Sequence, residues 1–574
     1  MTISDFTPED RCAAVTAIER RLKPADLRAV IPPRVAKMVI NAERQGRLYD
    51  PRMPEAQLVP FLLDLHGPEL LRDASIRERL LGSATDAELK ELFAYNGDAA
   101  PPRGRKAAER IIANRRWHPG KSWPAFFVKT LGLPLALGGS PDGGAMPAFE
   151  DIDPYVPLPP LHDYQELLSR EVVETLSAPP GHNRAILSLP TGAGKTRTVV
   201  HAVMSEYHGG KRFGQFMLWI AQSDELCEQA LVSFREVWTD MCVRSSLSGQ
   251  IRGESLRLFR MWSTRPYPDP CEHGVVIASI QKLDNMFRSP SADVSDFIDR
   301  IGLVIIDEAH HAIASSYTGV FRSLGLVVKR PEDSVRPMIG LTATPYRGSE
   351  AERGQLRRRF FDRLLIPGWD NPMTTLREMG ILARMSTEPL ATGRTYCLTD
   401  AEIEKVTQFK DLPSSALTRI GDDHTRNAMI LQRLLAIEPD WPVLLFGCSV
   451  EHATSLALLL RRAGRLAAVV TGDTPRALRR QRIEDFREGR LQFLCNFGVL
   501  TTGFDAPKVR AVVVARPTSS VLLYEQMVGR GMRGRMNGGT DECLVIDMVD
   551  AIPQFGGLMS YQRYADMWAK KGQA

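Results

Sequence analysis

One short stretch constrains this chain more than any other: residues 188–196 read Ser-Leu-Pro-Thr-Gly-Ala-Gly-Lys-Thr. The stretch follows the apolar run 185–187 and precedes residues 197–200, which read as the start of a helix. A strand, a glycine-rich loop and a helix, in that order, form the usual context of a phosphate-binding loop. Leu189 stands where the usual pattern has its first glycine. The stretch therefore predicts a triphosphate site between a strand and a helix, and the alternative is a glycine turn before a surface helix.

The residue types in this loop suit a nucleotide with its metal ion. Glycines allow a tight turn that presents backbone N–H groups, with the positive end of the following helix behind them. Lys195 is expected to reach the β- and γ-phosphates, and the hydroxyl of Thr196 is expected to hold Mg²⁺. The expected cofactors are therefore ATP and Mg²⁺. The loop residues expected to bind them are Thr191, Gly192, Ala193, Gly194, Lys195 and Thr196.

Short apolar runs alternate with helical stretches from Leu161 onward. Continuous apolar strands separated by helices indicate parallel sheets that are covered on both faces. The runs form two sets that divide near residue 370, so the predicted fold class is α/β with two tandem parallel-sheet domains. The predicted strands are 217–221, 275–279, 303–306, 338–342, 443–446, 467–471, 492–496, 511–515 and 543–546.

The residues before this region predict a mainly helical accessory domain. Asp73 and Thr85 each stand at the expected N-cap of an apolar-periodic segment. Glycine-rich and then proline-rich residues after position 137 have the composition of a linker. The predicted organisation is a helical domain 1–137, a linker 138–160, an ATP-binding domain 161–370, a second α/β domain 371–555 and a helical tail 556–574.

Two basic segments leave alternatives open. Residues 103–121 hold seven Lys or Arg and one acid, with four aromatic residues between positions 117 and 127. Such a mixture suits a phosphate backbone and a stacked base, whereas Ile111 and Ile112 favour an ordinary helix with one buried side. Residues 476–490 hold six arginines and three acids, which favours a solvated helix over a nucleic-acid contact.

Composition excludes several classes of protein. Of the 574 residues, 44% are hydrophobic and 25% charged, as in ordinary globular proteins. The eight cysteines include no C-x-x-C pair, which argues against a zinc ribbon, an iron–sulfur cluster and a secreted disulfide framework. No apolar stretch approaches 18 residues, and the N-terminus has no basic region followed by an apolar one, so we expect a cytoplasmic protein with no membrane partner. The net charge of +5 favours a polyanionic partner only weakly.

A second chemical constellation follows the predicted strand 303–306, where the chain reads Asp-Glu-Ala-His at 307–310. A carboxylate at the C-terminal edge of a parallel strand is well placed for a second contact to Mg²⁺, and Asp307 fits this position. Glu308 is then expected to orient and deprotonate the attacking water. Neither an H-E-x-x-H pattern nor a cysteine cluster supports metal binding by His310 and His311.

Four segments, in order, resemble motifs I, II, III and VI of superfamily 2 helicases. They are residues 189–196, 307–310, 341–345 (Leu-Thr-Ala-Thr-Pro) and 526–533 (Gln-Met-Val-Gly-Arg-Gly-Met-Arg). The resemblance runs from about Leu161 to Asp550. It implies two RecA-like domains that hydrolyse ATP between them.

The resemblance also assigns residues to the nucleotide. Arg530 and Arg533 are implied to act with Lys195 and Glu308 as catalytic residues, since arginines from the second domain neutralise charge on the γ-phosphate. Gln165 resembles the residue that reads the adenine edge. Gly503 and Asp505, in a segment that resembles motif V, are implied to approach the ribose and the interdomain seam. The G-x-G-x-x-G pattern at 529–534 follows a helical stretch, which argues against a dinucleotide site.

Further residues are implied to contact nucleic acid or to couple it to the nucleotide. The alternatives are strand-end caps for Ser279 and Gln281, and turn hydroxyls for the threonines of motif III. The implied nucleic-acid contacts are Ser279, Gln281, Thr471, Gly472 and Thr501. The implied coupling residues are His310, Thr342, Thr344 and Gln526.

The choice of residues within the motifs resembles one branch of the superfamily. Asp-Glu-Ala-His, Thr-Ala-Thr and a leading Gln in motif VI are similar to type III restriction subunits and excision-repair DNA translocases. This resemblance implies an ATP-dependent DNA helicase or double-stranded DNA translocase, in repair, restriction or anti-phage defence. The alternatives are an RNA helicase, and an ATP-gated sensor or motor subunit that acts through a partner nuclease or methyltransferase subunit.

Overall fold

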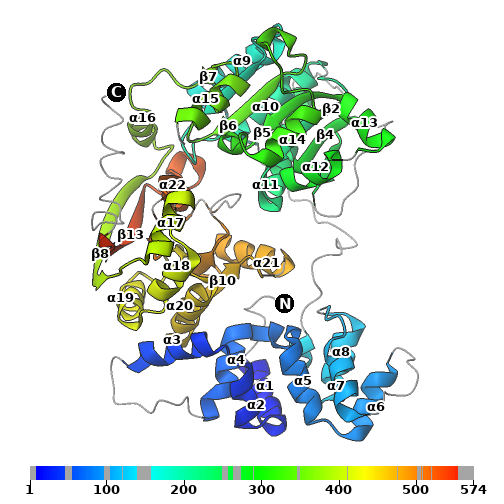
Figure 1. Ribbon diagram of the computed structural model, residues 1–574, viewed down its shortest axis with the longest axis vertical. Helices are drawn as coiled ribbons and strands as arrows, with labels where there is room; N and C mark the ends of the chain where they lie inside the picture. Colours follow the sequence, from blue (N-terminus) through cyan, green and yellow to red (C-terminus); the bar gives the residue numbers. More distant parts are fainter. Residues whose placement is uncertain are drawn as a thin grey trace.

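A computed structural model describes most of the chain (Figure 1). The described residues are 8–44, 55–95, 104–118, 120–138, 157–211, 213–247, 256–262, 273–288, 290–345, 350–409, 411–474, 476–500, 506, 508–518 and 520–553. The predicted helical tail 556–574 lies outside them.

The N-terminal region consists of short helices packed around one apolar core. Asp73 accepts a hydrogen bond from Ser75 N at 2.8 Å, and Thr85 forms a capping box with Glu88, so both predicted caps are confirmed. The helices are α1 (Pro8–Arg21), α2 (Pro24–Val30), α3 (Pro33–Arg44), η2 (Glu55–Gln57), α4 (Leu58–His66), η3 (Gly67–Arg72), α5 (Ala74–Gly82), α6 (Asp86–Ala94), α7 (Arg105–Ala113), α8 (Ser122–Thr130) and η4 (Leu135–Gly138).

The first basic segment contributes its aromatic residues to this core. Trp123 and Phe127 are buried. Arg115 donates hydrogen bonds to the carbonyls of Leu92 and Phe93, and its guanidinium lies 4.8 Å from the Trp123 ring centroid. The structure therefore favours the ordinary amphipathic helix over a base-stacking surface here.

Lobe 1 is a seven-stranded sheet with its covering helices. Its strand order is β3-β4-β2-β5-β6-β1-β7, and all of these neighbours pair in parallel. The strands are β1 (Arg184–Ser188), β2 (Phe216–Ala221), β3 (Leu258–Met261), β4 (Gly274–Ser279), β5 (Ile301–Ile306), β6 (Met338–Thr342) and β7 (Leu364–Leu365). All four strands predicted in this half are present.

Helices cover both faces of the lobe 1 sheet (Figure 1). Successive residues of a strand point to opposite faces, and in β2 Trp219 joins one apolar cluster while Leu218 and Ile220 join another. Burial on both faces explains why the strand reads as a continuous apolar run. The helices are α9 (Asp163–Ser177), α10 (Lys195–His208), α11 (Asp224–Leu247), α12 (Ile280–Phe287), α13 (Ala292–Asp299), η5 (Ala309–His311), α14 (Ser315–Ser323), η6 (Pro331–Asp333) and α15 (Glu350–Arg359).

Lobe 2 is a six-stranded parallel sheet in the order β10-β11-β9-β12-β13-β8, again with covering helices. The predicted class of two tandem parallel-sheet domains after a helical region is therefore confirmed. The strands are β8 (Arg384–Thr395), β9 (Val443–Phe446), β10 (Ala467–Thr471), β11 (Phe493–Phe497), β12 (Ala511–Val514) and β13 (Glu542–Ala551). The helices are α16 (Pro372–Glu378), α17 (Asp400–Phe409), α18 (Ser414–Gly421), α19 (His424–Leu435), α20 (Val450–Arg462), α21 (Arg476–Arg487), α22 (Val521–Val528), η7 (Gly529–Gly531) and η8 (Arg535–Asn537).

The N-terminal region packs on lobe 2, although lobe 1 follows it in sequence (Figure 1). Leu458 and Leu459 of α20 belong to the apolar core of the N-terminal helices. Arg461 of α20 donates a hydrogen bond to the carbonyl of Asp64, and Arg34 of α3 pairs with Asp422 at 3.3 Å. Two leucines of lobe 2 are therefore buried within the core of the N-terminal region.

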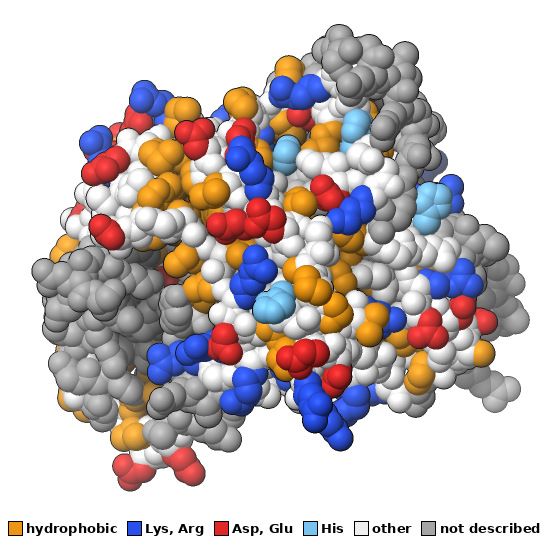
Figure 2. Space-filling model, turned by 90° about the horizontal axis from the view of Figure 1, so that it is seen from above, with side chains coloured by type: hydrophobic (Ala, Val, Ile, Leu, Met, Phe, Trp, Pro, Cys, Tyr) orange, Lys and Arg blue, Asp and Glu red, His pale blue; other side chains and the backbone are white. Residues whose placement is uncertain are grey.

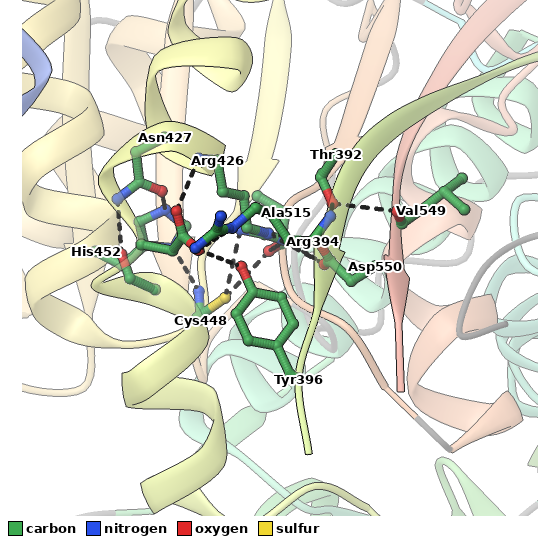
Figure 3. A network of polar contacts seen from close by, with 12 residues as sticks. Thr392, Arg394, Tyr396, Arg426, Asn427, Cys448, His452, Ala515, Val549 and Asp550 are labelled. Carbon is green, nitrogen blue, oxygen red and sulfur yellow. Dashed lines mark hydrogen bonds and ion pairs between the residues drawn. The ribbon is translucent and has the colours of Figure 1, made fainter. Parts of the chain in front are cut away.

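A buried polar network joins α19 to strands β8 and β13 of lobe 2 (Figure 3). The Arg426 side chain is fully buried and donates to Asp550, with an Nη2–Oδ2 distance of 2.9 Å, and to the carbonyl of Ala515. Thr392 of β8 donates to the same carboxylate at 2.8 Å. Burial opposes ionisation, but Asp550 more than offsets it and raises the pKa of Arg426.

Candidate nucleotide-binding site

The glycine-rich loop connects the end of β1 to the start of α10, as the sequence predicts. Gly192 and Gly194 have φ angles of 86° and 83°, in the left-handed region that favours glycine. A Cβ atom at Gly194 would collide with the side-chain amide of Gln165. The left-handed backbone therefore favours glycine at position 194, and any larger residue would also displace the Gln165 amide.

Lys195 lies within this loop and close to two carboxylates. Its Nζ donates a hydrogen bond to the carbonyl of Leu189 at 3.1 Å. Burial lowers the pKa of Lys195, whereas the nearby charges of Glu308 and Asp307 act in the opposite direction. The ammonium group is thus held between the loop and the acidic end of β5.

Asp307 and Glu308 follow directly after β5. The backbone amide of Glu308 donates to Asp307 Oδ1 at 3.0 Å, and Glu308 has a left-handed φ of 50°, which is uncommon for a residue with a side chain. Burial and the charge of Glu308 raise the pKa of Asp307. Burial opposes ionisation of Glu308, but a hydrogen bond from His310 and the charge of Lys195 lower its pKa to about 2.

These residues fit a magnesium ion that is also held by a nucleotide. Asp307 is a buried carboxylate whose negative charge is incompletely compensated, and a divalent cation would relieve that deficit. Thr196 follows Lys195 at the start of α10 and offers a hydroxyl oxygen, a hard ligand of the type that Mg²⁺ prefers. Among the described residues, no three His, Cys, Asp or Glu side chains gather to hold a metal by themselves.

Lobe 2 reaches this site through the segment after α22. Arg530 acts electrostatically on Lys195, Asp307 and Glu308. The Arg533 side chain and Leu382 lie against Gly192, within 3.6 Å of where its Cβ atom would be. The structure thus brings Lys195, Asp307, Glu308, Arg530 and Arg533 together from two lobes.

Gln165 also lies against the loop rather than in solvent. It is only 2% exposed, accepts a hydrogen bond from His162 N at 3.0 Å and donates to the carbonyl of Ala193 at 3.3 Å. The neighbouring Tyr164 donates to the same carbonyl at 2.8 Å, and its ring lies 5.3 Å from that of Trp369 in the segment between the lobes.

Three residues that the sequence did not predict also contact the glycine-rich loop: Asn537, Tyr164 and Leu382. Asn537 of η8 donates to the carbonyl of Gly192 at 3.0 Å, across the two lobes. Tyr164 adjoins Gln165, so the segment that resembles the adenine-reading motif already marked its position. Asn537 and Leu382 stand outside every motif, and only the fold places them here.

The four residues predicted to couple nucleotide and nucleic acid lie near the acidic end of β5 or on α22. His310 Nδ1 is 3.3 Å from Glu308 Oε2 and 3.1 Å from Thr342 Oγ1. Thr342 also accepts a hydrogen bond from the backbone amide of Thr344 at 3.1 Å, and the Thr344 hydroxyl is buried. Gln526 lies on α22, which leads into η7.

The predicted nucleic-acid residues lie at the carboxyl ends of strands. Ser279 ends β4 and is 4% exposed, while Gln281 is exposed and donates to the carbonyl of Gln222 at 3.0 Å. Thr471 ends β10, and Arg479 donates to its carbonyl and to that of Gly472, both at 3.1 Å. The predictions for Thr501, Gly503 and Asp505 fall outside the described residues.

Figure 2 shows the molecule from the lobe 1 end. Acidic, basic and hydrophobic side chains are interspersed on this face, unlike the single-sign surface typical of a phosphate-backbone contact.

Two family models match the chain over the parts that build this site. Residues 158–347 match the model described as "Type III restriction enzyme, res subunit", and residues 426–535 match "Helicase conserved C-terminal domain". Together the two matches extend over just more than half of the chain. The chain belongs to the superfamily 2 helicases, in the branch that resembles type III restriction subunits.

Three relatives illustrate this membership. The chain is 26% identical to the "Putative ATP-dependent helicase IRC3" of Saccharomyces cerevisiae, over 68% of this chain and 52% of that protein. It is 27% identical to the "Putative mitochondrial ATP-dependent helicase irc3" of Schizosaccharomyces pombe, over 65% and 55%. It is 24% identical to the "Type I restriction enzyme EcoKI endonuclease subunit" of Escherichia coli, over 65% and 33%. The chain thus spans about half the length of the helicase relatives it matches.

Within the described residues, no helix has both the length and the apolar character that crossing a membrane requires.

Proposed function

We propose that the protein is a nucleic-acid-dependent ATPase that uses ATP hydrolysis between its lobes to move along double-stranded DNA or to separate its strands. One observation supports this most strongly: the segment of lobe 2 that carries the two arginines contacts the glycine-rich loop of lobe 1, where the Arg533 side chain lies against Gly192 and Asn537 donates to the carbonyl of Gly192 at 3.0 Å. An arginine supplied across a domain boundary is the device by which nucleotide hydrolysis senses domain closure.

The chemistry follows from the charges around the loop. Mg²⁺ held by Thr196 and Asp307 would neutralise charge between the β- and γ-phosphates. Lys195 is placed to bind the same oxygens. Glu308, whose pKa is held low, orients a water molecule toward the γ-phosphorus. As the water oxygen bonds to phosphorus, its proton passes to Glu308 and the bond to the β-phosphate oxygen breaks.

Movement then follows from lobe separation. Arg530 and Arg533 stabilise the γ-phosphate only while the lobes are closed, so loss of phosphate weakens the contact between them. Nucleic acid held by residues of both lobes, among them Gln281 and Gly472, would be displaced once per cycle. In this proposal, the release of phosphate is coupled to the displacement of the nucleic acid through Gln526, Thr342, Thr344 and His310.

DNA is the proposed partner for two reasons. The matched family model is that of a restriction enzyme subunit, and one relative is named as a restriction endonuclease subunit. The sequence choices within motifs II, III and VI point to the same branch. A cytoplasmic location belongs to the proposal as well, and the fission yeast relative, named as mitochondrial, makes cell fractionation its test.

The decisive experiment compares ATPase rates of the purified protein with double-stranded DNA, single-stranded DNA and RNA. Double-stranded DNA is expected to stimulate the ATPase rate most.

Lys195→Ala should abolish turnover and weaken ATP binding, whereas Glu308→Gln should abolish turnover but still bind ATP. Arg530→Ala should lower kcat by about 10³-fold, while Arg535→Ala, at an exposed arginine paired with Asp541, is the matched control. Stimulated ATPase that survived Glu308→Gln would contradict the assignment.

A motor subunit that works through a partner nuclease or methyltransferase is the second candidate. The likeness to a restriction endonuclease subunit, over one third of that protein, favours it. Strand displacement and triplex displacement assays separate the two functions, because a pure translocase removes a third strand without separating the duplex.

A further inference from the structure

The chain that connects the two lobes meets the nucleotide site at two points. Residues 366–371 leave lobe 1 after β7 and lead into α16. The ring of Trp369 packs against that of Tyr164, with centroids 5.3 Å apart and an angle of 60° between the ring planes. Further along, Leu382 lies 3.3 Å from the position that a Cβ atom would take at Gly192. The connecting chain therefore contacts the surroundings of the glycine-rich loop before the first strand of lobe 2 begins.

Trp369 is itself held in place by its neighbours. Its backbone amide donates to the carbonyl of Pro367 at 2.8 Å. Its side chain is half-buried and packs against an apolar cluster that includes Leu376 of α16. Two residues further on, Asn371 caps α16 by accepting a hydrogen bond from Thr374 N at 3.2 Å. These contacts fix where the Trp369 ring lies relative to lobe 1 and to α16.

Tyr164 connects the Trp369 ring to the backbone of the loop. It is 4% exposed, and its hydroxyl donates to the carbonyl of Ala193 at 2.8 Å, a carbonyl that also accepts from Gln165. Because a peptide group is planar and trans, a fixed Ala193 carbonyl also fixes the direction of the Gly194 N–H group. The N–H groups of such a loop are the donors that hold phosphate oxygens. The Tyr164 hydrogen bond therefore orients one phosphate donor.

We propose that Trp369 is a positioning residue for ATP binding, which acts through Tyr164 on the peptide group between Ala193 and Gly194. The proposal rests on the proposed function only in taking the glycine-rich loop as the ATP site. The Trp369 ring confines the Tyr164 ring to the position from which its hydroxyl reaches the loop. Because Trp369 belongs to the chain between the lobes, this contact makes the affinity for ATP depend on how the lobes are arranged.

Titration with a fluorescent ATP analogue, without nucleic acid, tests the proposal. Trp369→Ala should weaken binding by about threefold to tenfold, the size expected when about one hydrogen bond is lost. Trp238→Ala is the matched control, because Trp238 is also half-buried against the same apolar cluster and packs on Tyr207, with ring centroids 5.5 Å apart, at the end of α10 remote from the loop. Equal losses in the two variants would refute the proposal.

Three further variants test whether Trp369 acts through Tyr164. Trp369→Phe keeps a ring against Tyr164 and should recover most of the affinity, so a loss as large as in Trp369→Ala would refute the role of the ring contact. Tyr164→Phe removes only the hydroxyl and should weaken binding by itself. Combined with Trp369→Ala, it should cause no further loss, because both changes act on the same hydrogen bond. Losses that multiply would overturn the proposal. If circular dichroism shows that Trp369→Ala does not fold, Trp369→Leu takes its place with the same expectations.

Steady-state kinetics separate a positioning role from general damage. Trp369→Ala should raise KM for ATP by the factor found in the titration and leave kcat within about twofold of the parent. A fall in kcat at unchanged KM would contradict the proposal. Equal analogue affinities in the parent and Trp369→Ala would overturn this inference alone. ATPase activity that no nucleic acid stimulates would overturn the proposed function, whereas the analogue affinities would still decide the role of Trp369.

Discussion

At the scale of single residues, the nucleotide site depends on backbone conformations that few side chains allow. Gly194 is left-handed and lies against Gln165, and Glu308 adopts a similar φ although it carries a side chain. Strain of this kind persists only where the surroundings enforce it. At Glu308, the enforcing contacts are the hydrogen bond to Asp307 and the approach of His310.

Gly194→Ala is expected to weaken ATP binding. The substitution carries the cost of a left-handed L-residue, about 1–2 kcal/mol, and the added Cβ would force the Gln165 amide to shift. Titration with a fluorescent ATP analogue measures the effect. Gly489→Ala is the matched control, because Gly489 has a similar φ of 77° and nothing within 4 Å of its Cβ position. Loss of binding in both variants would assign the effect to general destabilisation.

At the scale of elements, the strands that the sequence reveals are those buried on both faces. β2, β4 and β12 are buried throughout and read as apolar runs. The edge strand β8 is 12 residues long but mostly exposed, and it contains Pro389, which an edge strand tolerates. No apolar run marks such a strand, so the prediction missed it, along with the short strands β3 and β7.

The sequence likewise predicts only part of the candidate site. Short motifs mark Lys195, Asp307, Glu308 and Arg530 because phosphate chemistry demands those side chains at those positions in the chain. Asn537 contributes a single amide from the end of the short helix η8, and many residue types suit such a position, so nothing in the sequence distinguishes it. Its contact with Gly192 follows only from how the lobes meet.

The buried pair Arg426–Asp550 is expected to hold α19 against the lobe 2 sheet. Asp550→Asn should destabilise lobe 2 by about 3–5 kcal/mol, because it leaves a buried guanidinium without its counter-charge. Glu388→Gln should cost at most about 1 kcal/mol, because the Glu388–Arg433 pair is partly exposed. Hydrogen exchange of the amides in α19 and β13 measures both, and equal effects would contradict the argument.

Lobe 2 is also expected to lose stability in mild acid through His452. This side chain is fully buried, its Nδ1 accepts a hydrogen bond from Cys448 N, and burial lowers its pKa to about 3 (Figure 3). An unfolded histidine titrates near 6.5. The stabilisation is therefore complete above pH 6.5 and declines as the pH falls toward 3. Thermal midpoints of lobe 2 between pH 7 and pH 4 should fall less steeply in His452→Gln.

At the scale of the whole molecule, the N-terminal region is docked on lobe 2, and we expect the two to move together. Leu458 and Leu459 lie inside the apolar core of the N-terminal helices, and ion pairs and hydrogen bonds surround them. Shared cores of this kind resist relative motion far better than polar interdomain contacts. We expect rearrangement during the ATPase cycle to occur between lobe 1 and the other two parts, because the proposed arginine contacts to the γ-phosphate cross that boundary.

Distance measurements by single-molecule fluorescence check this expectation. With one dye on α1 and another on α19, the distance should stay constant when ATP analogues bind. With the second dye moved to α13 of lobe 1, the distance should change. A nucleotide-dependent change in the first pair would show that the N-terminal region moves independently.

The docking of the N-terminal region has a topological consequence. Lobe 1 is continuous with the N-terminal region at one end, through residues 139–156, and with lobe 2 at the other, through residues 366–371. A body held by two covalent tethers cannot swing as widely as one on a single hinge. Cutting the first tether with a protease should leave the amino-terminal fragment bound, yet free lobe 1 to open further.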